Sequence, residues 1–281
     1  MRSDIHSALL SSFVACSVLA GCAVEAQEPG GGEGRIQRAE EALLSGNALT
    51  ANALTANALM SNALTANALT ANALTANALA AIQDPGPSGA LARDSLRYIV
   101  SCALGADAAF DFSWTDAGGV VHSETFPGQL GLAASWKDGS IEDEDAAWVS
   151  SCLAARVNYY GVPVAISVRG KHKQLKKVDD VEVDDFPWKE GAFWGNLFID
   201  SPAVYACYSP DQVDHARANL RDCAAGHVSA GGIVQGCGPI QIVGSCDSVC
   251  GNAQPKYGYH SQCDAGTGAG GEGKPITVFL D

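Results

Sequence analysis

Hydrophobic and polar residues follow different patterns in four successive parts of the chain. Residues 8–19 are mostly apolar, whereas Gly, Glu and Pro dominate residues 23–46. A leucine stands at every fifth position within residues 47–81. Turn-forming residues then cluster at 83–89, and alternating helical and strand patterns follow them. The pattern therefore predicts a folded domain over residues 82–281, preceded by three segments of other kinds.

Within this domain, apolar residues recur with the spacing of helices in some segments and of strands in others. The helical segments are 88–105, 143–158 and 209–223. The strand segments are 109–114 and 120–125, which form a hairpin, together with 162–168, 203–208 and 276–280. Asp180, Glu182 and Asp184 alternate, as they would on one face of a solvated, charged strand. Helices interspersed with short strands predict an α+β fold.

Seven leucines at a strict spacing of five, from Leu49 to Leu79, form the most regular feature of the sequence. On an α-helix each step of five turns the side chain by about 140°, so the leucines would form no stripe. They would stack in a four-sided coil, and the segment resembles the pentapeptide-repeat family in this respect. Here Asn stands two positions before each Leu, where that family has it one before. A partial coil, a helical stalk and a flexible spacer remain alternatives, and each would hold the domain away from its attachment point.

The N-terminus carries the features of an export signal. The apolar run 8–19 has the length of a signal segment and is too short to cross a bilayer. It ends in Leu19-Ala20-Gly21-Cys22, which resembles a bacterial lipobox. The resemblance implies that residues 1–21 are removed, that Cys22 carries lipid and that residues 22–46 are a flexible linker. Because Ala rather than Asp follows Cys22, the resemblance favours the outer membrane. An ordinary signal peptide is the alternative, and no later segment is apolar enough to span a membrane.

Composition and charge narrow the range of partners. Hydrophobic residues make up 47% of the chain, but the signal and the repeat supply much of that figure. The formal net charge is −14. Since nucleic-acid affinity depends largely on Lys and Arg, an acidic chain of this kind is not expected to bind nucleic acid.

The cysteines predict disulfide bonds in the exported domain. Ten cysteines are present, and removing Cys16 with the signal and Cys22 with the lipid leaves eight. An even number in an oxidising compartment predicts four disulfides. Cys102 and Cys152 lie on the apolar stripes of two predicted helices and are expected to pair, while Cys207 and Cys223 flank the third helix and could close a local loop. The remaining four lie in a Gly-rich tail: Cys237, Cys246, Cys250 and Cys263.

A metal site in that tail, with His260 as a further ligand, is the alternative interpretation. The spacing of the four cysteines lacks the short Cys-x-x-Cys pairs of structural zinc sites. The sequence therefore predicts no metal and no cofactor.

Catalytic motifs are weak throughout. Gly226-His227-Val228-Ser229-Ala230-Gly231 departs from the Gly-x-Ser-x-Gly turn of serine hydrolases, and no His-Glu-x-x-His occurs. No catalytic residue is assigned. The best candidate for binding is the aromatic segment 186–196, in which Trp188, Trp194 and Asn196 have the chemistry to stack on and hydrogen-bond a sugar. Packing in an aromatic core is the alternative.

The chain as a whole resembles bacterial lipoproteins in which Asn-Ala-Leu repeats precede a Cys-rich exported domain, a resemblance that implies no particular activity. We expect a lipid-anchored envelope protein whose domain binds or scaffolds a partner at the cell surface. The membrane would be reached through the lipid, and the further partner would be a protein or a carbohydrate. An exported hydrolase acting on cell-wall or extracellular polymer is the alternative.

Overall fold

The computed structural model describes residues 48–54, 68–70, 73–266 and 273–281. The expected signal, Cys22, the linker and part of the repeat lie outside these residues. Helices and strands mix along the described chain, which confirms an α+β, disulfide-rich fold. None of the helices in the described ranges has the length and apolar character needed to cross a membrane.

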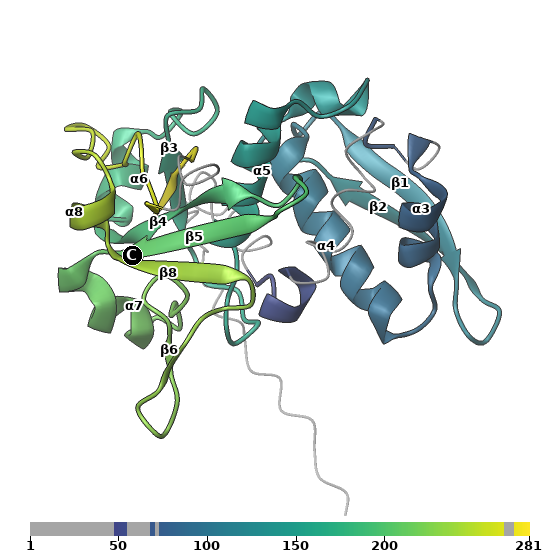
Figure 1. The fold of residues 1–281 in the computed structure, drawn as a ribbon. Coiled ribbons are helices and arrows are strands. Elements are labelled where there is room, and N and C mark those ends of the chain that lie inside the picture. The colour runs from purple at the N-terminus through teal and green to yellow at the C-terminus, as the bar shows by residue number, and fades with distance from the viewer. Residues whose placement is uncertain (1–47, 55–67, 71–72, 267–272) are drawn as a thin grey trace, which may run out of the picture.

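Helices and strands follow one another as shown in Figure 1. The α-helices are α3 (Ala76–Gln83), α4 (Pro87–Ala103), α5 (Asp143–Ala155), α6 (Asp180–Asp185), α7 (Val213–Ala218) and α8 (Cys246–Val249), with 3-10 turns η2 (Ala134–Lys137) and η3 (Pro210–Gln212). The strands are β1 (Ala109–Thr115), β2 (Val121–Pro127), β3 (Ser167–Gly170), β4 (Trp188–Asn196), β5 (Ala203–Tyr208), β6 (His227–Val228), β7 (Val234–Gln235), β8 (Ile240–Ser245) and β9 (Ile276–Leu280).

The central sheet has the strand order β3-β9-β4-β5-β8. Its pairs are antiparallel except for β5 and β8, which run parallel. Helix α5 packs against β4 and β9, and α4 lies on the other side of α5 (Figure 1). The β1–β2 hairpin packs beside α4 as a separate small sheet. Helix α5 is therefore buried between the sheet and α4, in agreement with its many buried residues.

Three local expectations differ from the structure. Residues 180–185 form helix α6, because the side chain of Asp179 caps it by accepting a hydrogen bond from the Glu182 amide at 2.8 Å. The expected strand 162–168 is reduced to β3, which begins at Ser167. The central strand β4 lies within the aromatic segment 186–196 that was considered for binding. It was not predicted as a strand, because the Gly and Pro residues of this segment are unfavourable in strands.

The third expected helix ends early, at Ala218, and the chain then turns inward. Leu220 has a φ of 58°, the only positive φ of a residue other than glycine in the described chain. The Arg221 amide donates to the Ala216 carbonyl at 2.8 Å and the Leu220 amide to the Arg217 carbonyl at 3.0 Å. This is a Schellman ending, with leucine where glycine is usual. It directs the Arg221 side chain into the core.

Four disulfides are formed, as expected from the cysteine count. Cys102–Cys152 joins α4 to α5, which confirms that pairing. The expected local bond between Cys207 and Cys223 is wrong. Strand β5 places Cys207 beside the start of α8, and the six remaining cysteines form the bonds Cys207–Cys246, Cys223–Cys237 and Cys250–Cys263.

The leucines of the repeat belong to the hydrophobic core wherever the structure describes them. Leu49, Leu54 and Leu69 are fully buried, and the half-buried Leu74 and Leu79 pack against the same core. The backbone is also paired with the domain, since the Leu69 amide donates to the Trp136 carbonyl at 2.7 Å. These residues cover the domain instead of holding it at a distance, which corrects the expected spacer. The expected boundary at residue 82 falls inside α3.

We predict that Leu54→Ala will lower the free energy of unfolding by about 2–5 kcal/mol, because it leaves a cavity in the core. The matched control is Asn52→Ala, an exposed position in the same helical turn, which should change stability by less than about 0.5 kcal/mol. Urea unfolding followed by circular dichroism measures both. Equal stability of the two variants would restore the spacer interpretation.

Candidate functional site

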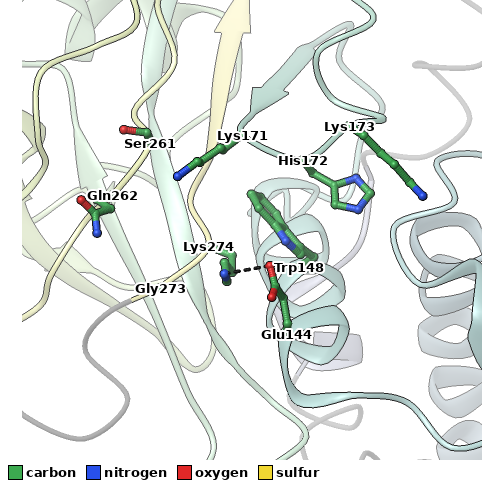
Figure 2. Close-up of a pocket in the computed structure, with 9 residues that line it drawn as sticks. All are labelled: Glu144, Trp148, Lys171, His172, Lys173, Ser261, Gln262, Gly273 and Lys274. Atoms are coloured by element: carbon green, nitrogen blue, oxygen red, sulfur yellow. Dashed lines mark hydrogen bonds and ion pairs between the residues drawn. The ribbon is translucent and has the colours of Figure 1, made fainter.

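A cavity of about 610 Å³ opens at one end of the central sheet. Figure 2 shows its walls, which come from three segments distant in sequence. They are the first turns of α5, the loop after β3 and the segment that leads into β9. The lining residues are Glu144, Trp148, Lys171, His172, Lys173, Ser261, Gln262, Gly273 and Lys274.

Strand pairing brings the cationic residues of the cavity together. Gly170, at the end of β3, pairs with Ile276, at the start of antiparallel β9. The residues after β3 and those before β9 must therefore emerge at the same end of the sheet. Glu144 and Trp148 lie four residues apart on α5 and so share one face of the helix.

Glycine is required where the wall of the cavity packs on an aromatic ring. A Cβ atom on Gly273 would lie 2.2 Å from Cδ1 of Trp194, which is much closer than two carbon atoms approach. Trp194 is fully buried and supports the wall from behind. Its function is therefore structural: it fixes the path of the chain that leads to Lys274.

The cavity carries a net positive charge within an acidic protein. Lys274 Nζ lies 2.9 Å from Glu144 Oε1, and this bond holds the pKa of the Glu144 carboxyl below its usual value. Lys171 and Lys173 form no ion pair with any residue of the described ranges. One carboxylate is thus matched by one ammonium group, and two further ammonium groups remain available to an anion.

His172 is positioned as a neutral hydrogen-bond donor. Burial lowers the pKa of its imidazole, and the charge of Lys173 lowers it further. The backbone amide of Gln174 donates to Nδ1 at 3.2 Å, so the proton of the neutral ring resides on Nε2. The ring packs at an angle on Trp148, with 5.4 Å between ring centroids.

The structure does not assemble Trp188, Trp194 and Asn196 into one binding surface. Trp194 is buried, and the Asn196 side chain accepts a hydrogen bond from the Phe198 amide at 2.8 Å. Trp188 alone is exposed, and it packs at an angle on His215. The aromatic-core alternative holds for Trp194. Asn196 caps a turn.

The cysteines proposed as alternative metal ligands are all in disulfides. The sulfur atoms of Cys207, Cys246 and Cys250 lie within 4.8 Å of one another because two disulfides are adjacent. A disulfide sulfur is not a thiolate and so is a poor metal ligand. His260, the proposed fifth ligand, donates from Nδ1 to the Gly251 carbonyl and faces Lys189 with Nε2.

Sequence reasoning found parts of this cavity without connecting them. The basic run 169–177 and the acidic first turn of the helix that begins at residue 143 are both visible in the sequence, but neither of them by itself indicates a site. Nothing in the sequence linked them to Gln262 or Lys274, since only the β3–β9 pairing does so.

Comparison with known proteins adds no assignment to this geometry: no family model, curated protein or solved structure matches the chain. The functional argument therefore depends on the cavity itself.

We predict that His172 titrates below the ordinary histidine value of about 6.5. As the pH falls, the unfolded chain then binds the proton first, so stability is lost between the unfolded and the folded pKa. An NMR titration of the imidazole resonance, assigned by its disappearance in His172→Gln, measures the value. A His172 resonance that titrates above 6.5 would contradict the neutral state.

Proposed function

We propose that the chain is a lipid-anchored binding protein of the bacterial cell surface, and that its cavity receives the anionic group of a ligand. The observation that carries this proposal is the pair Lys171 and Lys173, which line the cavity and form no ion pair within the described residues of an otherwise acidic chain. Excess ammonium charge in a concave site attracts carboxylate, sulfate or phosphate groups.

The other walls suit a polar ligand with an acidic substituent. His172 offers its Nε2–H group, and Ser261 and Gln262 offer hydroxyl and amide groups from the opposite side (Figure 2). The volume of about 610 Å³ lies in the range of small-ligand sites. Carbohydrates that bear carboxylates combine these features, because they present hydroxyls together with negative charge. We therefore favour an acidic saccharide as the ligand.

We predict that Lys171→Ala with Lys173→Ala will weaken the binding of an acidic oligosaccharide at least tenfold. A hydrogen bond to a charged group contributes about 1.5–3 kcal/mol, and about 1.4 kcal/mol is a factor of ten. Titration calorimetry with oligogalacturonate measures the affinity. Affinity should also fall as NaCl rises.

Lys256→Ala is the matched control, because Lys256 is exposed and does not line the cavity. It should bind as the wild type does. The neutral ligand maltohexaose should show no dependence on the two cavity lysines. Loss of binding to the same extent in the control would mean that the net charge of the protein, and not the cavity, attracts the ligand.

A hydrolase is the second candidate, and one observation favours it. A neutral histidine and a carboxylate, His172 and Glu144, line the same cavity, so the carboxylate is able to accept a proton from water while the Nε2–H group of His172 donates to the substrate. Release of reducing ends from oligogalacturonate, abolished by His172→Gln but not by Lys256→Ala, would establish the hydrolase. Binding without product would favour the binding protein.

The lipid anchor has its own test. We predict that the wild-type chain, expressed in bacteria, will incorporate radiolabelled palmitate and fractionate with membranes. Cys22→Ser should lose the label, because the thiol that carries the lipid is absent, whereas Cys16→Ser should keep it. A wild-type chain without label would contradict the anchor and leave the cavity proposal unaffected.

A further inference from the structure

A short hairpin, β6–β7, holds aliphatic side chains out in the solvent. Val228, Ile233 and Val234 are 38%, 65% and 56% exposed. Figure 1 shows the hairpin extending away from the body of the protein next to α7. No charged residue occurs from Val228 to Cys246, although the chain carries a net charge of −14. The apolar tip is therefore free of the charges that cover the rest of the surface.

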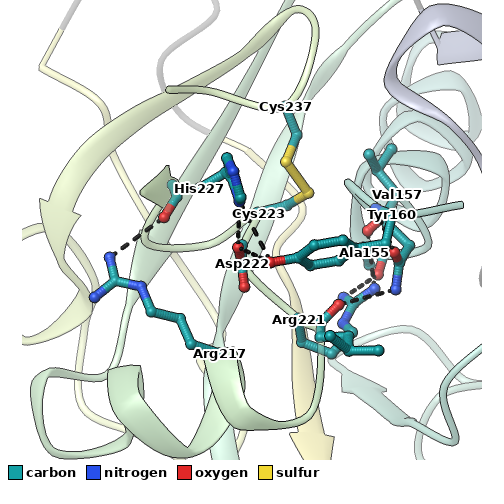
Figure 3. The surroundings of a disulfide bond; sticks show 12 residues. Ala155, Val157, Tyr160, Arg217, Arg221, Asp222, Cys223, His227 and Cys237 are labelled. Carbon is teal, nitrogen blue, oxygen red and sulfur yellow. Dashed lines mark hydrogen bonds and ion pairs between the residues drawn. A yellow bond between two sulfur atoms is a disulfide. The ribbon is translucent and has the colours of Figure 1, made fainter. Parts of the chain in front are cut away.

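The base of this hairpin is firmly fixed. Cys223 and Cys237, which flank it, are bonded to each other (Figure 3). His227 Nδ1 lies 2.7 Å from Asp222 Oδ2, and the Tyr160 hydroxyl donates to the same oxygen at 2.9 Å. The backbone at the base is also packed closely, since a Cβ atom on Gly226 would lie 2.4 Å from Cγ1 of Val234. A loop held in this way cannot fold its aliphatic tip back onto the body.

Tyrosines lie just behind the tip. Tyr159 stacks on the His227 ring with 3.8 Å between centroids, and Tyr160 meets the same ring edge-on. Both tyrosines are exposed, at 38% and 42%, as is the nearby Leu220. The arrangement thus runs from aliphatic residues at the tip to tyrosines at the base. The same order is found where proteins cross from the acyl chains of a bilayer to its headgroups, a zone in which tyrosine is enriched.

We infer that the tip of the β6–β7 hairpin inserts into the interfacial region of a lipid bilayer. A tip of three aliphatic residues is small beside the roughly 800 Å² that each partner contributes to a stable protein interface. A second copy of this chain would also bring a like charge of −14. An uncharged bilayer surface requires no matching charge, and the tip would bind it with a strength that scales with the apolar area that it buries. This inference is independent of the cavity.

The test places a tryptophan at the tip of the full-length chain. Ile233→Trp is compared with Val121→Trp, which changes an equally exposed valine in the charged β1–β2 hairpin. Each protein is mixed with phosphatidylcholine vesicles that contain or lack brominated acyl chains. The added emission of Ile233→Trp should shift to the blue and be quenched at least twofold by the brominated lipid, while that of Val121→Trp should not change.

Flotation of the same vesicles separates the tip from the lipid anchor. If the chain floats but the Ile233→Trp emission is not quenched, the inference is overturned and the anchor remains. If Cys22→Ser still floats and Cys22→Ser with Ile233→Asp does not, the tip binds membranes by itself. A blue shift without quenching, together with dimers in analytical ultracentrifugation, would assign the tip to a contact between copies and overturn the membrane inference.

Discussion

The buried ion pair of Arg221 and Glu190 connects the principal parts of this structure. Both side chains are fully excluded from solvent, and Arg221 Nε donates to Glu190 Oε2 at 3.0 Å. The same guanidinium donates to the carbonyls of Ala155 and Val157, at 2.8 Å each, where α5 ends (Figure 3). Burial raises the pKa of Glu190, and the charge of Arg221 opposes that rise. Removal of one partner from such a pair typically costs about 3–5 kcal/mol, because the other charge is left buried.

The left-handed backbone at Leu220 leads directly to the Arg221 of this ion pair. The Schellman turn ends α7 and points Arg221 inward, while the next residues, Asp222 and Cys223, begin the base of the β6–β7 hairpin. One side chain thus fixes the end of α5, the strand β4 and the position of the hairpin. The cavity lies at the other end of α5, where Glu144 faces Lys274. Since α5 rises about 1.5 Å per residue, most of the helix separates the cavity from the base of the β6–β7 hairpin. The two sites are therefore free to act independently.

The disulfides differ in how much hydrophobic core surrounds them. Cys102–Cys152 lies within the main core, where apolar contacts already join α4 to α5. Cys250–Cys263 instead closes a loop with few large apolar side chains, and Ser261 and Gln262 reach the cavity from within this loop. Oxidation is therefore a condition for one wall of the candidate site. A chain of this kind is suited to an oxidising compartment, in which such bonds persist.

The sequence by itself determined the local features, because they depend on neighbouring residues. Helical periodicity identified α4 and α5, alternation identified the β1–β2 hairpin, and the even number of cysteines predicted full pairing. The aromatic segment 186–196 was not predicted as a strand, because its glycines and charged residues interrupt the strand pattern. It forms β4 because β5 and β9 pair with it on its two sides. Propensity over a few residues carries no information about such partners.

Only the tertiary structure decided which distant segments meet. The repeat leucines that the structure describes, although spaced for a coil, are packed in or against the main hydrophobic core, because an existing apolar surface accommodates leucines at any spacing that the backbone can reach. Cys207 pairs with Cys246 instead of Cys223, because β5 and β8 are neighbours in the sheet. Lys171 and Lys274 line one cavity because β3 and β9 are antiparallel. The strand order of the sheet accounts for the last two of these contacts, and strand order is a property of the whole fold.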